Sequence, residues 1–337
     1  MGVNSPGEQA LIDPPRTART RLESLPGGSA AALGLPGHWY VVCPAVRVSH
    51  AASEPFAVCG FHIGLRRNPD RTITCTEIRR PVGGVPEATP LIVKECAPGG
   101  TLPWVEKDGY VWAYLGRDAS PHPPPALEPL HDGDMVFETR TIPVRADWRL
   151  VLENSLDFAH SAILHSWSSP IWLMHRFSRQ WIVEARYQRT ADGLTVDGLL
   201  GRRTLFRHSF HLPDRMRLTL LPDKSRPMDV VVHHVPEGPG VSRMEILAGR
   251  RRAPWEPRHS PERPIRFREG ALRLHRQDVE ICELQQRVWE RLRPDPERHC
   301  AADAYTLLLR RVLEDAAAGK PWLASAEERV RQVHLRV

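Results

Sequence analysis

Two histidines and an acidic residue stand close together in the segment 153–165. Asp157, His160 and His165 supply one carboxylate and two imidazoles, the groups that bind first-row transition metals. Asp157 and His160 are three residues apart, so they share one face of a helix, where the carboxylate can orient the imidazole. His160 and His165 differ by about 140° around an ideal helix. They can bind one metal only where the helix ends or bulges. Polar residues on an exposed helix face are the alternative.

A second acidic residue strengthens the case for a metal. The segment 271–289 predicts an amphipathic helix, in which Asp278 lies about 40° from Leu274 on the apolar face. The other apolar positions are Ile281, Cys282, Leu284, Val288 and Trp289. A carboxylate directed at a core is costly unless something pairs with it. A metal held by both histidines would pair with Asp278 and complete the two-histidine, one-carboxylate triad of non-haem Fe(II) oxygenases; an arginine is the alternative partner.

The elements that must position these residues fall into two groups. Short β-like runs occupy residues 37–116, among them Trp39–Cys43 and Phe56–Leu65, and a Pro-rich segment at 121–129 ends them. The later pattern predicts a helix at 148–164, four or five strands between 180 and 248, and helices near 270–291 and 301–317. This mixture indicates an α+β fold. We divide the chain into a flexible leader (1–34), a β domain (35–130), a catalytic domain (131–320) and a C-terminal tail (321–337).

Five segments, taken in order, resemble one known family. They are Gly37–Tyr40, Asp108–Gly116, Asp147–Asn154 leading into the D-x2-H-x4-H motif of 157–165, Gln277–Gln286, and Asp303 with Arg310 and Arg311. The family is that of the alpha subunits of Rieske non-haem iron, aromatic-ring-hydroxylating oxygenases, in the branch of phthalate dioxygenase-like and demethylase enzymes. The resemblance covers roughly residues 37–311.

This resemblance implies a fold and a site. The fold would be a Rieske-like β domain followed by a helix-grip (START-like) catalytic domain with a curved antiparallel sheet. His160, His165 and Asp278 would bind a mononuclear Fe(II). Asp157 would be the acid that links an iron-binding histidine to the Rieske cluster of a neighbouring subunit, and Asn154 would be a polar group near the iron.

The motif for the family's own cluster is incomplete. A Rieske cluster needs C-x-H and, later, C-x-x-H, and no C-x-H occurs in this sequence. Cys59 and His62 form a literal C-x-x-H, but within one alternating strand an offset of three places them on opposite faces. After Cys75 the residues 76–86 leave no room for two ligand-bearing loops. We therefore expect no 2Fe-2S cluster in this chain, which is similar in layout to the Rieske-less subunit of methylxanthine N-demethylase.

The expected function follows from the resemblance. It implies an Fe(II) oxygenase component that uses O2 to hydroxylate or oxidatively demethylate an aromatic, heterocyclic or natural-product substrate. Electrons would come from a separate Rieske- or ferredoxin-bearing partner and its reductase, in a trimer or a hetero-oligomer. A non-catalytic companion subunit that stabilises a cluster-bearing homologue is the main alternative. A ligand-binding protein or non-redox enzyme that reuses the hydrophobic cavity is a third.

The composition limits the cellular location and the kinds of partner that we expect. The chain has 337 residues, a formal net charge of +6 and six widely spaced cysteines, which suit free thiols. It shows no secretory pattern and no membrane-spanning run, so we expect a cytoplasmic protein. Its basic residues form no long cluster, which argues against nucleic-acid binding, whereas the net charge favours an acidic protein partner.

Several aromatic and histidine positions of the predicted strands stay unassigned. We expect His208, His211, His233 and His234 to be surface or strand histidines and not metal ligands. Candidate pocket-lining positions are Phe206, His208, Phe210, Val232 and His234.

Overall fold

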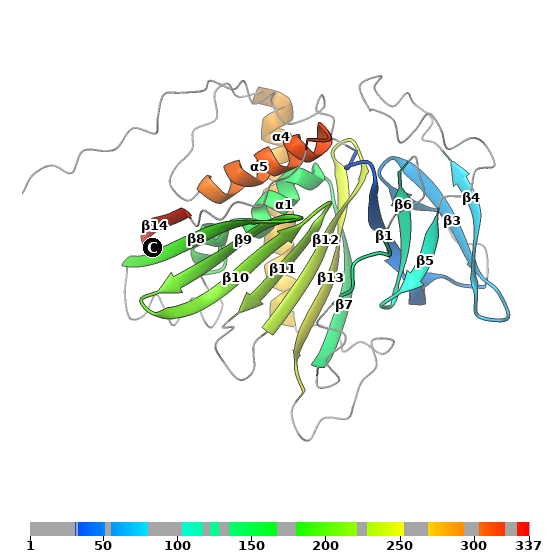
Figure 1. The fold of residues 1–337 in the computed structure, drawn as a ribbon, viewed down its shortest axis with the longest axis horizontal. Coiled ribbons are helices and arrows are strands. Elements are labelled where there is room, and N and C mark those ends of the chain that lie inside the picture. Colours follow the sequence, from blue (N-terminus) through cyan, green and yellow to red (C-terminus); the bar gives the residue numbers. More distant parts are fainter. Residues whose placement is uncertain are drawn as a thin grey trace, which may run out of the picture.

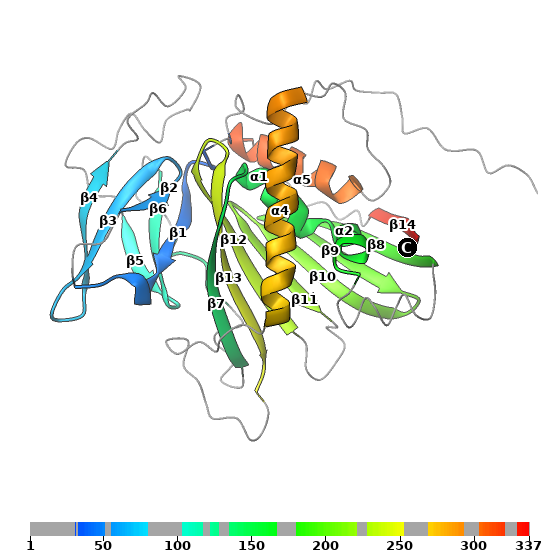
Figure 2. The ribbon, with the colours of Figure 1, turned by 180° about the vertical axis from the view of Figure 1, so that it is seen from behind.

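The computed structural model describes residues 31, 33–50, 55–79, 103–116, 122–127, 135–166, 180–220, 228–252, 269–292, 303–320 and 329–336. Within them the chain forms two parts that lie side by side (Figure 1). The first part holds two small sheets, and the second holds a large antiparallel sheet with helices packed on it (Figure 2). This mixture of helices and antiparallel sheets confirms the predicted α+β class.

The first part consists of two three-stranded antiparallel sheets, in the orders β1-β6-β5 and β2-β3-β4. The strands are β1 His38–Pro44, β2 Phe56–Val58, β3 Phe61–Arg67, β4 Ile73–Arg79, β5 Trp104–Lys107 and β6 Tyr110–Leu115, and a 3-10 turn, η1, covers Ala45–Arg47. Every residue of β6 is buried, because this central strand carries apolar or aromatic side chains on both of its faces.

The second part is built on one eight-stranded antiparallel sheet, in the order β14-β8-β9-β10-β11-β12-β13-β7. Its strands are β7 Met135–Val144, β8 Gln180–Thr190, β9 Gly193–Leu200, β10 Arg203–His211, β11 Arg215–Leu220, β12 Met228–Gly238, β13 Val241–Arg251 and β14 Arg329–Arg336. Six strands lie between residues 180 and 251, where four or five were predicted. β14 pairs with β8, so the assignment of 321–337 to a tail is wrong for residues 329–336, which extend the sheet.

In the described residues, four α-helices accompany this sheet: α1 Trp148–Leu156, α2 Phe158–Leu164, α4 Glu269–Leu292 and α5 Ala304–Ala317. Figure 2 shows α4 running across the face of the sheet. The core beneath the helices includes Leu152 of α1, Cys282 of α4 and Leu309 of α5, and burial of this apolar surface holds the helices on the sheet. None of these helices is long and apolar enough to cross a membrane.

The predicted single strand Phe56–Leu65 is wrong, because a tight turn divides it into β2 and β3. Cys59 and Gly60 form the turn with φ of 49° and 79°, and positive φ at both central residues is typical of a type I′ hairpin. Their backbone N–H groups donate to the carbonyls of Pro236 and Glu237 on β12, at 2.6 and 3.1 Å. Contact with the second part therefore stabilises a turn that residue alternation does not reveal.

A buried arginine joins the two parts. The guanidinium of Arg243 on β13 donates to the carbonyl oxygens of Val41 and Val42 on β1, at 3.0 and 2.6 Å. It also forms ion pairs with Glu237 and Glu245, at 2.8 and 2.9 Å. Because a buried charge is tolerated only when it is paired and hydrogen-bonded, this residue fixes the relative position of the small sheets and the large one.

The end of the predicted leader packs on the folded chain. Ala31 and Leu33 are both buried. The carbonyl of Ala31 accepts a hydrogen bond from the indole Nε1 of Trp148 on α1, at 3.0 Å. Both residues belong to the segment that the sequence assigned to the leader, and Ala31 helps to hold the first turn of α1, the helix that precedes the candidate site.

Candidate metal centre

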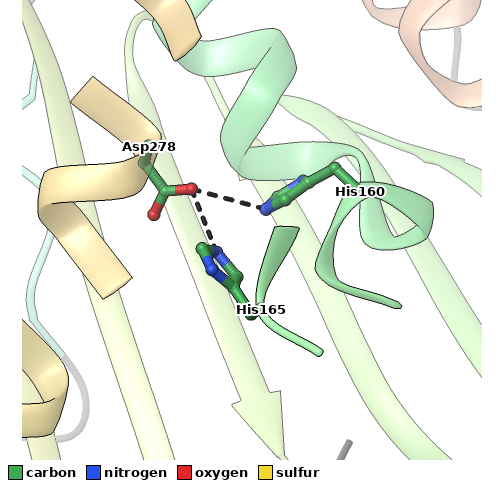
Figure 3. A group of neighbouring side chains, drawn as sticks. All are labelled: His160, His165 and Asp278. Carbon is green, nitrogen blue, oxygen red and sulfur yellow. Dashed lines mark hydrogen bonds and ion pairs between the residues drawn. The ribbon is translucent and has the colours of Figure 1, made fainter. Parts of the chain in front are cut away.

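His160, His165 and Asp278 come together at one point of the second part (Figure 3). The Oδ1 atom of Asp278 lies 3.1 Å from Nε2 of His165 and 3.5 Å from Nε2 of His160. One donor atom from each of the three residues lies within 4.8 Å of the others. Among the described residues this is the one such group of histidine, cysteine, aspartate or glutamate side chains.

A break in the helix allows both histidines to face one point. The predicted helix 148–164 is divided at Asp157, which ends α1 and begins α2. The Asp157 carboxylate accepts a hydrogen bond from the backbone N–H of Ala159 at 2.8 Å, which is the bond of a helix N-cap. His165 is the C-cap of α2, with φ of −108° and ψ of 24°. It therefore lies at the end of a helix. The angle of about 140° between His160 and His165 on an ideal helix requires such an end if both imidazoles are to bind one metal.

Asp278 reaches the site from α4, and the predicted apolar face of this helix is partly wrong. Cys282 is fully buried and Ile281 packs on the core. Leu284 and Val288, however, are 47% and 39% exposed. The side chain of Asp278 is 23% exposed, so it borders the core and is not enclosed by it. The helix thus presents its carboxylate at the margin of the packed face, where solutes can approach.

Two further side chains hold the triad in place. The amide Nδ2 of Asn154 donates to Oδ1 of Asp278 at 3.3 Å, so Asn154 contacts the triad. The Oε1 atom of Gln277 accepts a hydrogen bond from Nδ1 of His165 at 3.2 Å. Gln277 has no signal in the sequence beyond its place beside Asp278. Such contacts from surrounding residues orient metal-binding imidazoles.

Asp157 does not make the contact expected of it. Within the described residues its carboxylate caps α2, and the buried Nδ1 atom of His160 has no hydrogen-bond partner. The two groups are still close enough to interact through charge. Burial raises the pKa of Asp157 above its usual value, and the positive charge of His160 only partly offsets this.

The electrostatics of the triad favour a cation. Burial opposes ionisation of Asp278, but hydrogen bonds from His160 and His165 outweigh it and hold the pKa of this carboxyl well below its usual range. Burial lowers the pKa of His160, yet contact with Asp278 and the charge of Asp157 raise it overall. An anionic carboxylate beside two imidazoles is the electrostatic setting in which a metal replaces bound protons.

The donor set fits a divalent first-row metal. Because the amide oxygen of Gln277 only accepts, Nδ1 of His165 carries a proton. Nε2 donates to Oδ1 of Asp278 only when the ring carries a second proton, and without it the Nε2 lone pair faces the carboxylate. Two acceptors at 3.1 Å are stable only with a proton or a metal ion between or beside them. Two imidazoles and one carboxylate are the ligands that non-haem Fe(II) sites use, so the residues fit the iron that the resemblance implies.

The remaining histidines of the sheet are engaged elsewhere. His208 Nδ1 lies 3.3 Å from the carbonyl of Leu156, and His211 Nδ1 lies 2.9 Å from Asp192. His233 Nδ1 lies 3.0 Å from Oδ1 of Asp214, and His234 Nε2 lies 2.8 Å from Oγ of Ser155. All four lie in strands, and within the described residues none belongs to the metal group.

Cys59 and His62 lie in different surroundings. Cys59 is buried in the hairpin turn, whereas His62 is exposed on β3. The turn at Cys59 divides the strand in which an offset of three would have placed the two side chains on opposite faces. The two side chains nevertheless form no metal group within the described residues. Cys43, Cys59 and Cys282 are free thiols, as expected.

No family model matches this sequence, and no curated protein does. Solved structures share its fold. Dicamba monooxygenase bound to 3,6-dichlorosalicylic acid is 12% identical, with a TM-score of 0.63 over 87% of this chain and 98% of that one. The terminal oxygenase of carbazole 1,9a-dioxygenase from Novosphingobium sp. KA1 is 19% identical, with a TM-score of 0.62 over 87% and 96%. Its counterpart from Nocardioides aromaticivorans IC177 is 17% identical, with a TM-score of 0.60 over 87% and 97%. The chain therefore has the fold of these oxygenase chains.

Proposed function

We propose that this protein is the mononuclear non-haem Fe(II) component of a Rieske-type oxygenase. It hydroxylates or oxidatively demethylates an aromatic, heterocyclic or natural-product compound with O2. The convergence of His160, His165 and Asp278, within a fold shared with dicamba monooxygenase and carbazole 1,9a-dioxygenase, is the observation that carries this proposal. These three side chains are the ligand set expected of such an iron site.

When bound, Fe(II) supplies the redox chemistry with O2. The chain's own residues prepare the site for it. Gln277 holds the proton of His165 on Nδ1 and so leaves Nε2 as a ligand atom. Asn154 donates to Oδ1 of Asp278 and restrains the carboxylate. Asp157 ends α1 and sets the direction of the short helix that carries His160.

The reaction requires an electron donor. Hydroxylation converts a C–H bond, O2, two protons and two electrons into a C–OH group and water, and one Fe(II) does not supply both electrons. Because the sequence lacks C-x-H, we propose that the first part is a Rieske-like β domain without a cluster, joined to a helix-grip catalytic domain. The electrons then come from a separate Rieske- or ferredoxin-bearing partner and its reductase.

The partner surface follows from the position of Asp157. We propose that this acid lies where a neighbouring cluster docks, in a trimer or a hetero-oligomer. Solved complexes of the carbazole 1,9a-dioxygenase oxygenase with ferredoxin are among the structures that share the fold. The net charge of +6 favours an acidic partner, whose association weakens as salt rises.

An iron assay tests the site. We expect about one iron per chain and no acid-labile sulfide. His160→Ala, His165→Ala and Asp278→Ala lose the iron, while His211→Ala keeps it, because this histidine lies on β10 and pairs with Asp192. Wild-type iron content in all three triad variants would refute the site, and stoichiometric sulfide would refute the cluster-less assignment.

Turnover tests the electron route. We expect O2-dependent product formation only with a cluster-bearing donor and reductase. Asp157→Asn retains iron but slows steady-state turnover strongly. Full activity with a flavin reductase alone, or an unimpaired Asp157→Asn protein, contradicts the route. Iron binding without O2-dependent turnover under any donor favours a companion subunit that stabilises an active homologue.

A further inference from the structure

His208 is a buried polar residue on the strand face beside the candidate metal centre. Along β10, His208 and Phe210 are buried while Arg207 is exposed, so the even-numbered side chains face the core. Phe210 belongs to the core cluster that also contains Leu156 and Phe158 of the two short helices. His208 is only 5% exposed. It therefore lies between the sheet and the helices that carry Asn154 and His160.

The hydrogen bond to α1 fixes which nitrogen of His208 carries the proton. Nδ1 lies 3.3 Å from the carbonyl oxygen of Leu156, and a carbonyl only accepts, so Nδ1 donates. Burial lowers the pKa of His208 to about 4, the bond to Leu156 opposes this, and positive charge at His160 adds to it. The ring is therefore neutral near pH 7 and Nε2 is an acceptor. Within the described residues, the one hydrogen bond of this ring is that of Nδ1 to Leu156.

Aromatic rings flank this acceptor. The Phe206 ring centroid lies 5.0 Å from that of His208, and Phe158 lies 5.0 Å from Phe206 at an interplanar angle of 35°. Phe158 is two residues before His160 on α2. Gly198 on β9 makes room for this arrangement, because a Cβ there would lie 2.1 Å from Cζ of Phe206. A row of mutually tilted aromatic rings thus runs from the strand to the helix of a triad histidine.

We propose that Nε2 of His208 accepts a hydrogen bond from the substrate, which is a neutral, flat aromatic or heteroaromatic compound that carries an N–H or O–H donor. The inference rests on the proposed function, which places the substrate beside His160. A compound without a donor that covers Nε2 deprives this acceptor of a hydrogen bond, which costs affinity. A carboxylate presents lone pairs to the lone pair of Nε2, so benzoate-like anions are disfavoured. Aromatic rings of the substrate stack on Phe206 and Phe158.

Binding of two nearly isosteric probes tests the acceptor. Indole and benzofuran differ at one ring atom, N–H or O. By titration calorimetry on the metal-free protein, we expect indole to bind about tenfold more tightly, since a site built around a hydrogen bond discriminates against the analogue that lacks it. His208→Phe keeps an aromatic ring but removes the acceptor, so the preference for indole disappears. His208→Gln places an amide oxygen near the position of Nε2 and retains the preference.

His211→Phe is the matched control. This histidine lies on β10 too, but on the opposite face, where it pairs with Asp192 at 2.9 Å. We expect its preference for indole to equal that of the wild type. Thermal unfolding of each variant checks that the fold is intact. Equal affinities for the two probes, binding of neither, or a preference that survives in a folded His208→Phe protein overturns the proposal.

The metal assay separates this proposal from the function on which it rests. The same calorimetry is repeated with the Asp278→Ala protein, in which the triad is broken. If the protein with Asp278 intact binds no iron but still prefers indole, and this preference depends on His208, the acceptor is supported. The same result refutes the proposed oxygenase function. Iron binding with no probe preference refutes the acceptor and leaves the metal site standing.

Discussion

Two groups of aspartate and histidine lie in the second part of this protein, and they differ in what their atoms face. Asp278 meets two imidazoles with the same carboxylate oxygen, and its side chain is 23% exposed. Asp214 meets the imidazole of His233 with one oxygen at 3.0 Å, and its side chain is 1% exposed. The residue types are the same. Only in the first group do three donor atoms converge.

The hydrogen bonds of the second group diverge. His234 donates through Nδ1 to the backbone carbonyl of Asp214 and accepts at Nε2 from the hydroxyl of Ser155 on α1. His233 points to the Asp214 carboxylate and packs edge-on against Trp112 of β6. Each hydrogen-bonded ring nitrogen of these two histidines therefore contacts a different group. The comparison shows that a metal site requires converging lone pairs, whereas divergent bonds between the same residue types cross-link strands, a helix and the first part.

The largest expected effect separates the two aspartates. Asp278→Ala should reduce iron below a tenth of the wild-type content, with little change in stability because the side chain is partly exposed. Asp214→Ala leaves a buried imidazole unpaired and should lower the free energy of unfolding by about 3 kcal/mol, while the folded protein keeps its iron. Iron content and urea unfolding of the metal-free proteins measure both. An Asp214→Ala protein as stable as the wild type, or an Asp278→Ala protein with wild-type iron content, would contradict the distinction between a structural and a metal-binding aspartate.

Acid should unfold the protein through its buried neutral histidines. Burial lowers the pKa of His234 and of His208 to about 4, below the usual 6.5. The unfolded chain then binds protons that the folded chain does not, so stability is complete above about pH 6.5 and falls as the pH drops toward 4. Each histidine accounts for about 3 kcal/mol over that window. Urea unfolding at several pH values measures it, and His208→Phe should remove part of the slope. A pH-independent free energy of unfolding contradicts this prediction.

A smaller effect tests the orientation of His165. Gln277→Leu removes the acceptor of its Nδ1–H and should weaken metal binding by roughly 10–100-fold. Gln277→Glu keeps an acceptor at that place and should bind at least as tightly as the wild type. Competition titration with Co(II) measures the affinities without any turnover. Equal affinity in Gln277→Leu would mean that the packing of α2 alone orients the imidazole.

The smallest expected effect concerns Asn154. Its amide donates one hydrogen bond at 3.3 Å to Asp278, and the loss of one such bond costs about 1 kcal/mol. Asn154→Ala should therefore weaken metal binding only several-fold, and Asn154→Asp, which brings a negative charge to the same place, should change the pH dependence of binding. A loss as complete as that of Asp278→Ala would make Asn154 a direct ligand.

Local patterns in the sequence predicted the three side chains that the structure brings together at the candidate site. The spacing of Asp157, His160 and His165 pointed to a helix that must end or bend, and Asp278 stood out on the apolar side of a long helix. Such patterns are readable because helix periodicity and capping act within a few residues. The same reasoning failed to find Gln277, because its contact with His165 spans 112 positions of the chain.

Tertiary structure decided how these local elements meet. The 113 positions between His165 and Asp278 are bridged by the packing of α4 beside α1 and α2, which no local propensity encodes. Leu284 and Val288 are exposed although the helix pattern placed them inside, since the extent of a buried face depends on the neighbouring element. The turn at Cys59 and Gly60 likewise depends on carbonyls of β12. Local sequence sets which conformations are available, and long-range packing and hydrogen bonding select among them.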